Sequence, residues 1–288
     1  MEIRSVLAAG SHLGETPVWD DRQSVLWWID IYKPTINRFD PVGGANRELV
    51  LDRAVHAIAL RRGGGIVAAL LNGFGYVDPA SGAIEIIADP LGDAAVKFND
   101  GKCDRQGRFW SGSMANDWVT PIGGLHRLDA DGSVRTLDRG IKLANGLGWS
   151  PDDRTMYFTD FGRSTIYAYD YDAAGGTIAN RRPLIVVPEG EGQPDGMAVD
   201  AAGDLWVALW DGWAIARFDP AGRRTATIAL PVQRPTSCCF GGPDLATLYV
   251  TSATMQLDAA ALAAQPQAGS LFAIEGAGRG LPEPRFSG

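Results

Sequence analysis

The chain has 288 residues, of which 45% are hydrophobic and 21% charged, and this composition is typical of a globular protein with a buried core. Its formal net charge at pH 7 is −8. Nucleic acid and anionic membranes bind to basic surfaces, so we expect neither as a partner. Three cysteines, two of them adjacent (Cys238 and Cys239), form no disulfide framework. Because the N-terminus also lacks the pattern of a signal peptide, we expect a cytoplasmic protein.

Short stretches of β-branched and aromatic residues alternate with turn residues along the whole chain, and this pattern predicts strands. A polar turn followed by a strand recurs six times, at 20–30, 61–70, 104–113, 150–160, 200–209 and 241–252. Each copy has a short strand just upstream, and most copies are followed by a third and a fourth strand. The copies repeat roughly every 40–50 residues, a spacing typical of propeller blades.

Six copies of four strands predict an all-β fold, a six-bladed β-propeller with four antiparallel strands per blade, over residues 1–288 as one domain. Two packed sandwiches or a β-helix fit such complete and evenly spaced repeats less well. A propeller must also close its ring. We expect the extra strand at 3–8 to pair with the strand at 270–274 in the last blade. The one clear helical pattern covers residues 257–265.

Polar residues recur where the first strand of each blade begins. These strands line the central channel of a propeller, so their first residues gather at one end of it. In chain order they are Glu15, His56, Asn99 with Asp100, Asn145, Asp195 and Thr236. Oxygen donors such as Glu15, Asn145 and Asp195 suit Ca²⁺, Mg²⁺ or Mn²⁺, and sometimes Fe²⁺ or Zn²⁺. Three protein ligands would leave positions for water and substrate, as in catalytic metal sites.

The same positions allow a second interpretation. Asn-Gly and Asp-Gly are common turn dipeptides, so Asn145-Gly146, Asp195-Gly196 and the segment 99–101 could simply be bends before a strand. Their recurrence at matching places in the repeat, together with Glu15, favours a shared ligand site.

Five segments carry a resemblance to a known family: LGETPVW (13–19), KFNDGKCDRQGRFWSGSM (97–114), NGLGWSPD (145–152), PDGMAVDAAGDLWVAL (194–209) and TSCCFGGPDLATLYVTSA (236–253). In combination they resemble the family of regucalcin (SMP-30), gluconolactonases and luciferin-regenerating enzyme. The resemblance implies one divalent metal ion held by Glu15, Asn145 and Asp195, with Asp195 also acting as acid and base.

The resemblance also implies substrate contacts. Asn99 matches a substrate-binding asparagine of the family, and Lys97 stands where the regucalcin branch carries arginine. Lysine keeps the charge but loses the two-pronged geometry of arginine. Asp117 matches an acidic substrate contact. His56 could contact substrate or be a structural, hydrogen-bonded histidine.

We therefore predict a monomeric enzyme that uses one divalent ion (Ca, Zn, Mn, Mg or Fe) to hydrolyse a small-molecule sugar lactone to its aldonic acid. The candidate substrates are glucono-, xylono-, arabinono- and galactonolactone. Two alternatives stay open: a propeller hydrolase that acts on another ester or a phosphotriester, and a calcium-binding regulator or scaffold without turnover. Fold analogy alone does not choose among them.

Overall fold

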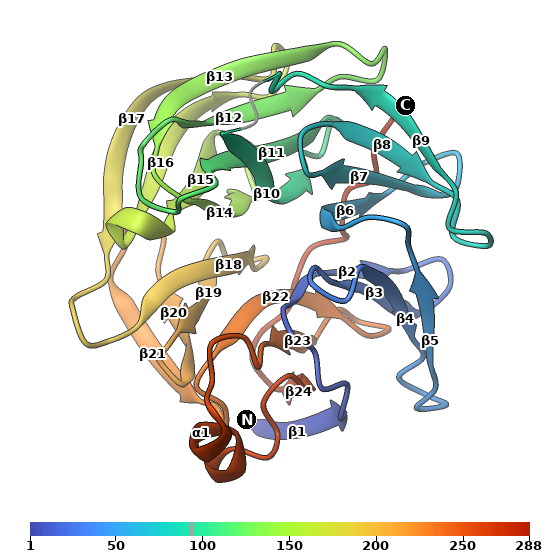
Figure 1. Ribbon diagram of the computed structural model, residues 1–288. Helices are drawn as coiled ribbons and strands as arrows, with labels where there is room; N and C mark the ends of the chain where they lie inside the picture. The colour runs from blue at the N-terminus through green and yellow to red at the C-terminus, as the bar shows by residue number, and fades with distance from the viewer. Residues whose placement is uncertain (93–94) are drawn as a thin grey trace.

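The computed structural model describes residues 1–92 and 95–288. Within these residues, strands β1 to β24 form six four-stranded antiparallel sheets, arranged as a ring around a central axis (Figure 1). The first strand of each blade lies nearest the axis and the fourth lies at the outer edge. The predicted six-bladed propeller is therefore confirmed.

The first blade contains β2 (Gly14–Asp20), β3 (Val25–Asp30), β4 (Thr35–Phe39) and β5 (Asn46–Val50). The second contains β6 (Val55–Leu60), β7 (Ile66–Leu70), β8 (Phe74–Val77) and β9 (Ile84–Ala88). The third contains β10 (Val96–Cys103), β11 (Phe109–Ala115), β12 (Gly123–Leu128) and β13 (Val134–Ile141). The fourth contains β14 (Ala144–Trp149), β15 (Thr155–Asp160), β16 (Thr165–Asp172) and β17 (Thr177–Val186). The fifth contains β18 (Gln193–Val199), β19 (Leu205–Trp210), β20 (Ala214–Phe218) and β21 (Arg224–Ala229). The sixth contains β22 (Pro235–Gly241), β23 (Thr247–Ser252), β24 (Leu271–Glu275) and β1 (Glu2–Leu7).

The sixth blade joins the two ends of the chain. Strand β1 pairs antiparallel with β24, for example Ile3 with Ile274, which confirms the predicted closing strand. The connection between β23 and β24 contains the short helix α1 (Ala259–Ala264), within the predicted helical segment. The Asp258 side chain caps this helix by accepting a hydrogen bond from the Ala261 amide. None of the helices in the described ranges is long and apolar enough to span a membrane.

A repeated aspartate–tryptophan pair explains part of the sequence repeat. In the third blade, the Trp110 indole donates a 2.9 Å hydrogen bond to Asp104, in the turn that precedes the strand. In the fifth blade, Trp206 donates to Asp200 over the same distance. Both tryptophans are fully buried between blades, and a buried indole needs such a partner. The spacing of aspartate and tryptophan is therefore set by packing.

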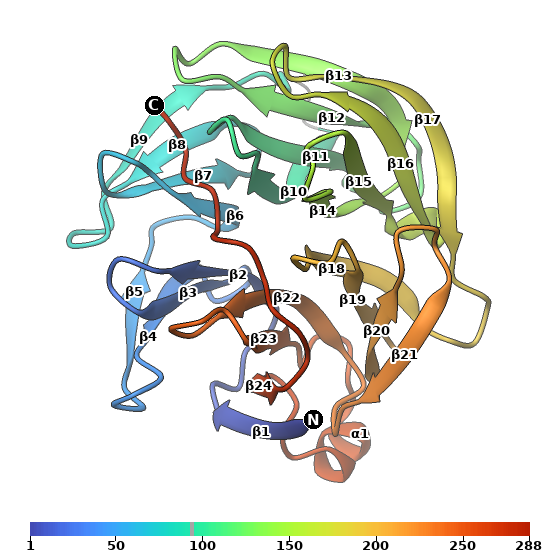
Figure 2. The same cartoon turned by 180° about the vertical axis from the view of Figure 1, so that it is seen from behind.

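After β24, residues 276–288 leave the ring and cross its back face, where Figure 2 shows them running across the channel towards β7 and β8. We call residues 276–288 the C-terminal segment. Its backbone accepts a bond from Ala201 in the fifth blade and exchanges bonds with Leu60 and Arg62 near the second. The Phe286 side chain is completely buried against the second and third blades. The segment thus ties together blades that are far apart in the ring.

Candidate metal and substrate site

Each innermost strand contains a β-bulge close to its beginning. In β14, Ala144 pairs with Asp160 and Leu147 with Phe158, so the inner strand has one residue more than its neighbour. The same irregularity occurs at the corresponding place in β2, β6, β10, β18 and β22. A bulge bends a strand locally and redirects its side chains. It therefore gives the polar residues at these positions an orientation that a regular strand would not.

The glycines that follow the polar residues are needed for close packing between blades. A Cβ atom on Gly146 would lie 2.6 Å from the carbonyl oxygen of Asp195, and one on Gly196 would lie 2.1 Å from Ser237 Oγ. Both glycines lie inside strands and neither has a positive φ. The interpretation of these dipeptides as simple turns is therefore wrong.

A cavity of about 190 Å³ opens at the end of the channel where the inner strands begin, which we call the mouth. Glu15, Asn99, Asn145 and Asp195 line it, from β2, β10, β14 and β18. We call these four residues the cavity floor. Glu15, Asn145 and Asp195 are each less than a tenth exposed. The structure thus brings the three predicted metal ligands together with one predicted substrate contact.

Buried negative charge dominates the floor. Burial, and next the charge of Asp100, raise the pKa of Glu15 well above its ordinary value. Burial raises the pKa of Asp195 in the same way, with the charges of Glu15 and Asp100 adding to it. Asp100 lies beside Asn99 in the third bulge, and burial raises its pKa to about 6, although Lys102 opposes the shift. Asp100, which the sequence places beside Asn99 at the start of an inner strand, is thus a third carboxylate close to Glu15 and Asp195, outside the cavity lining.

Two oxygen atoms at the floor have no hydrogen-bond partner in the part of the chain that the structure describes. Oδ1 of Asn145 and Oδ1 of Asp195 are buried and accept no hydrogen bond from the described residues. Leaving such groups unsatisfied is costly, roughly 1–3 kcal/mol each. Carboxylate and amide oxygens are the ligands that hard divalent cations prefer, and a cation would also offset the repulsion between the carboxylates.

The composition of this donor set is unusual in one respect. Among residues 1–92 and 95–288, no three His, Cys, Asp or Glu side chains come together as a metal site. The set at the floor consists instead of two carboxylates and the Asn145 amide. With two unsatisfied oxygens and a net negative charge, these residues fit a hard divalent cation.

Apolar side chains surround the cavity above the floor. Five of them form one cluster contributed by five different blades or their connections: Leu13, Trp118, Phe161, Trp210 and Met255. We call this cluster the collar. Trp118 and Trp210 both line the cavity, where an aromatic face can stack on a sugar ring. Trp213 is 42% exposed and lies outside the lining.

Lys97 and His56 lie near the cavity but not in its lining. The Lys97 ammonium is 5.2 Å from the centre of the Trp118 ring, and partial burial lowers its pKa. His56 is buried in the second bulge, and neither ring nitrogen has a hydrogen-bond partner among the described residues. Burial, with the charge of Lys97, lowers the pKa of His56 to about 4. Their contact with substrate stays a prediction.

Asp117 is exposed and bonded within its own turn. Its carboxylate accepts hydrogen bonds from the Val119 and Thr120 amides, each 2.9 Å long, and from the Thr120 hydroxyl. These bonds, that of the hydroxyl first, lower the pKa of Asp117 to about 2. The structure does not bring Asp117 to the cavity, so contact with substrate would require this turn to open. An aspartate three residues before a threonine is a turn signal that the sequence already contains.

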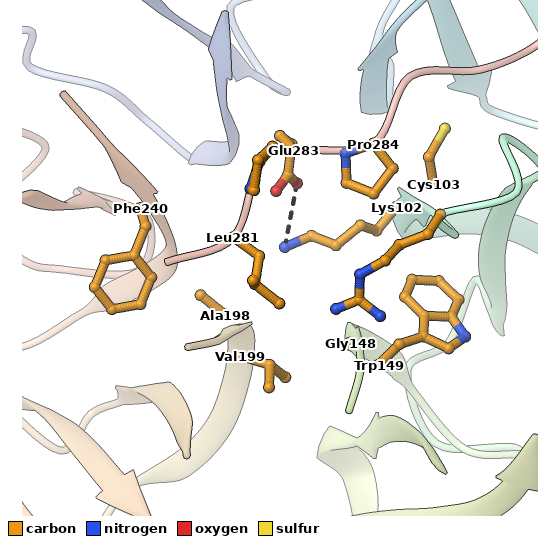
Figure 3. Close-up of a pocket in the computed structure, with 12 residues that line it drawn as sticks. Lys102, Cys103, Gly148, Trp149, Ala198, Val199, Phe240, Leu281, Glu283 and Pro284 are labelled. Carbon is orange, nitrogen blue, oxygen red and sulfur yellow. Dashed lines mark ion pairs between the residues drawn. The ribbon is translucent and has the colours of Figure 1, made fainter. Parts of the chain in front are cut away.

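The opposite end of the channel, the base, is closed. There, a second cavity of only about 50 Å³ lies between the inner strands and the C-terminal segment (Figure 3). The Lys102 ammonium is 3.5 Å from Glu283 and donates to the Met197 carbonyl oxygen. Although burial opposes it, the charges of Glu283 and Asp100 raise the pKa of Lys102. Leu281 and Pro284 complete the wall, so this end has no room for a substrate.

Comparison with known proteins places the chain in a family. Residues 13–254 match the family model described as the SMP-30/gluconolactonase/LRE-like region. The chain belongs to this family. The regucalcin of Gallus gallus is 39% identical over 296 aligned positions, which cover 100% of this chain and 99% of the relative. The family resemblance that the sequence carries is therefore confirmed.

Two solved structures are closely similar to this one. The first is a calcium-binding protein, regucalcin, from Agrobacterium tumefaciens, with a TM-score of 0.93 and 29% identity over 99% of this chain and 97% of that one. The second is a luciferin-regenerating enzyme, with a TM-score of 0.92 and 32% identity over 99% of both chains. The likeness extends over the whole ring.

Proposed function

We propose that this protein is a divalent-metal-dependent hydrolase that opens a sugar lactone to its aldonic acid, acting as a monomer in the cytoplasm. The observation that carries the proposal is the set of buried, unsatisfied oxygen donors on the floor of a small cavity. Membership of a family whose description includes gluconolactonases supports the same reaction class.

The dimensions of the cavity support a substrate the size of one sugar ring. Pockets for drug-sized ligands enclose roughly 300–1,000 Å³, whereas this cavity has about 190 Å³. Its polar floor would meet the lactone group, and the aromatic collar would cover the C–H face of the ring.

Glu15, Asn145 and Asp195 would hold the cation. When bound, the ion would supply a Lewis acid for the lactone carbonyl and lower the pKa of a water molecule. Asp195 would take the proton of the attacking water and return it to the ring oxygen as the C–O bond breaks. Its Oδ1 is free for this because no described residue donates to it. Asn99 donates to the Ala144 carbonyl oxygen, which leaves its own amide oxygen to accept from a substrate hydroxyl.

Removal and replacement of metal tests the proposal directly. Four aldonolactones are assayed with Ca²⁺, Zn²⁺, Mn²⁺, Mg²⁺ and Fe²⁺, and the spontaneous rate of ring opening is subtracted. We expect chelation to abolish turnover and one or more ions to restore it. Glu15→Gln should weaken ion binding by calorimetry, while the exposed control Glu48→Gln should not. Full turnover in thoroughly demetallated protein would contradict the proposal.

A second candidate is a calcium-binding protein without turnover. It is favoured by one observation, the description of the similar Agrobacterium protein as calcium-binding. Tight calcium binding, with none of the lactones, other esters or phosphotriesters hydrolysed, would select this candidate over the hydrolase.

A further inference from the structure

One carboxylate in the cavity wall lies outside the acidic floor. Asp211, in the connection between β19 and β20, lines the cavity next to Trp210. Its φ of 58° is in the left-handed region, as are those of two other lining residues, Trp118 and Gln256. Such backbones are strained for residues other than glycine and are typical of ligand-binding loops.

Two donors fix the Asp211 carboxylate through a single oxygen. Arg234 Nε donates to Oδ1 over 2.7 Å, and Gln233 Nε2 donates to the same atom over 2.8 Å. The other oxygen, Oδ2, accepts no hydrogen bond from the residues that the structure describes. The carboxylate is thus held firmly and still has one oxygen available to a ligand.

Arg234 connects this carboxylate to the collar. It is buried, its guanidinium lies 4.7 Å from the centre of the Trp210 ring, and it donates to the Met255 carbonyl oxygen. One arginine therefore sets the position of Asp211 relative to two collar residues. Such a supporting contact is expected around a group that must be positioned for a ligand.

We propose that Asp211 determines substrate specificity by accepting, at Oδ2, a hydrogen bond from a hydroxyl group on the lactone ring. Asp211 and Gln193 also line a shallow groove beside the cavity, with Ser164 and Glu189, so the carboxylate stands at the cavity rim, away from the floor. The hydroxyl it binds is therefore remote from the reacting carbonyl. This inference rests on the proposed function.

A pair of substrates isolates the effect of the hydroxyl groups. The aldonolactone that the wild type hydrolyses fastest is compared with the unsubstituted lactone of the same ring size, δ-valerolactone or γ-butyrolactone. A hydrogen bond to a charged group contributes roughly 1.5–3 kcal/mol. Asp211→Ala should therefore lower kcat/KM about tenfold or more for the hydroxylated lactone, chiefly through KM, and less than about twofold for the unsubstituted one.

Asp131→Ala is the matched control, because Asp131 is an exposed aspartate in the connection between β12 and β13, outside the cavity lining. Its kcat/KM should stay within about twofold of the wild-type value for both substrates. Equal losses on both lactones in Asp211→Ala, no loss on either, or a wild type that prefers the unsubstituted ring would overturn the inference.

A binding measurement separates this inference from the proposed function. If the wild type hydrolyses no lactone, the proposed function fails, and 1,5-anhydro-D-glucitol serves as a stable hydroxylated ring without a lactone group. Its binding is followed by tryptophan fluorescence, since Trp118 and Trp210 line the cavity. We expect the wild type and Asp131→Ala to bind it and Asp211→Ala to bind at least about tenfold more weakly. Identical titrations, or no binding by the wild type, would overturn the inference.

Discussion

At the mouth of the channel, Asn145 Oδ1 and Asp195 Oδ1 are buried and accept no hydrogen bond from the described residues. At the base, the partly buried Lys102 ammonium is paired with Glu283 and a backbone carbonyl. The same six inner strands form both ends. At the mouth, burial and mutual repulsion raise the pKa values of Glu15 and Asp195. At the base, the ion pair of Lys102 with Glu283 and the side chains of Leu281 and Pro284 close the channel.

This contrast indicates that the mouth of the channel serves function and the base serves stability. An unsatisfied buried oxygen destabilises a protein unless a ligand completes it. The base shows that the same ring of strands can satisfy its polar groups. The unsatisfied set at the mouth is therefore best explained by selection for ligand binding, and substitutions at the two ends should have opposite consequences.

The largest expected effect is on activity, at the mouth. Asp195→Asn removes the base and one metal ligand but keeps the shape of the side chain. We expect the rate of lactone hydrolysis to fall about 1,000-fold or more, while the metal-free protein unfolds at the same or a higher temperature, since one repelling charge is gone. The measurements are kcat/KM with added ion and thermal unfolding with chelator. A rate within tenfold of the wild type would remove Asp195 from its role.

The next effect is on stability, at the base. Phe286→Ala should lower the free energy of unfolding by about 3–5 kcal/mol because it leaves a cavity between the second and third blades. Activity per folded molecule should stay within about twofold. Urea denaturation measures the first quantity and titrated activity the second. The adjacent, exposed Ser287→Ala is the control, with an expected change under about 0.5 kcal/mol. If Phe286→Ala lost activity but not stability, the assignment of stability to the base and of function to the mouth would be wrong.

The smallest effect is a pH dependence at the mouth. Burial raises the pKa of Asp100 to about 6 from an ordinary 3.8, so the folded state binds a proton more tightly than the unfolded state does. Stability from this group is present at low pH and is lost as the pH rises through about 4 to 6. Metal-free wild type should therefore lose up to about 3 kcal/mol relative to Asp100→Asn across this range. The free energy of unfolding of both proteins is measured by chemical denaturation at each pH. If it changed with pH in the same way in the wild type and in Asp100→Asn, the raised pKa of Asp100 would be contradicted.

The sequence was sufficient to predict the ring. Strand patterns with a regular period determine the number of blades, because each blade must bury both faces against its neighbours. The closing pair of β1 with β24 followed from the need to complete the last blade. The three predicted metal ligands share a cavity because they occupy equivalent positions in the repeat.

Other features depend on contacts that no local pattern records. The bulges in the inner strands, which orient residues such as Asn145, leave no distinct sequence signal. The C-terminal segment has no strand periodicity, and its partners come from distant blades, so Glu283 and Phe286 could not be placed beforehand. The position of Asp211 depends on its hydrogen bond from Arg234, which lies in the connection between β21 and β22. Because these two residues are far apart in the sequence, no local pattern predicts their contact.

The pairing of β1 with β24 has a consequence for biosynthesis. Strand β1 is synthesised long before its partner β24, so a nascent chain leaves β1 unpaired until residues Leu271–Glu275 have been made. A truncated product would keep that strand unpaired and would be prone to aggregate.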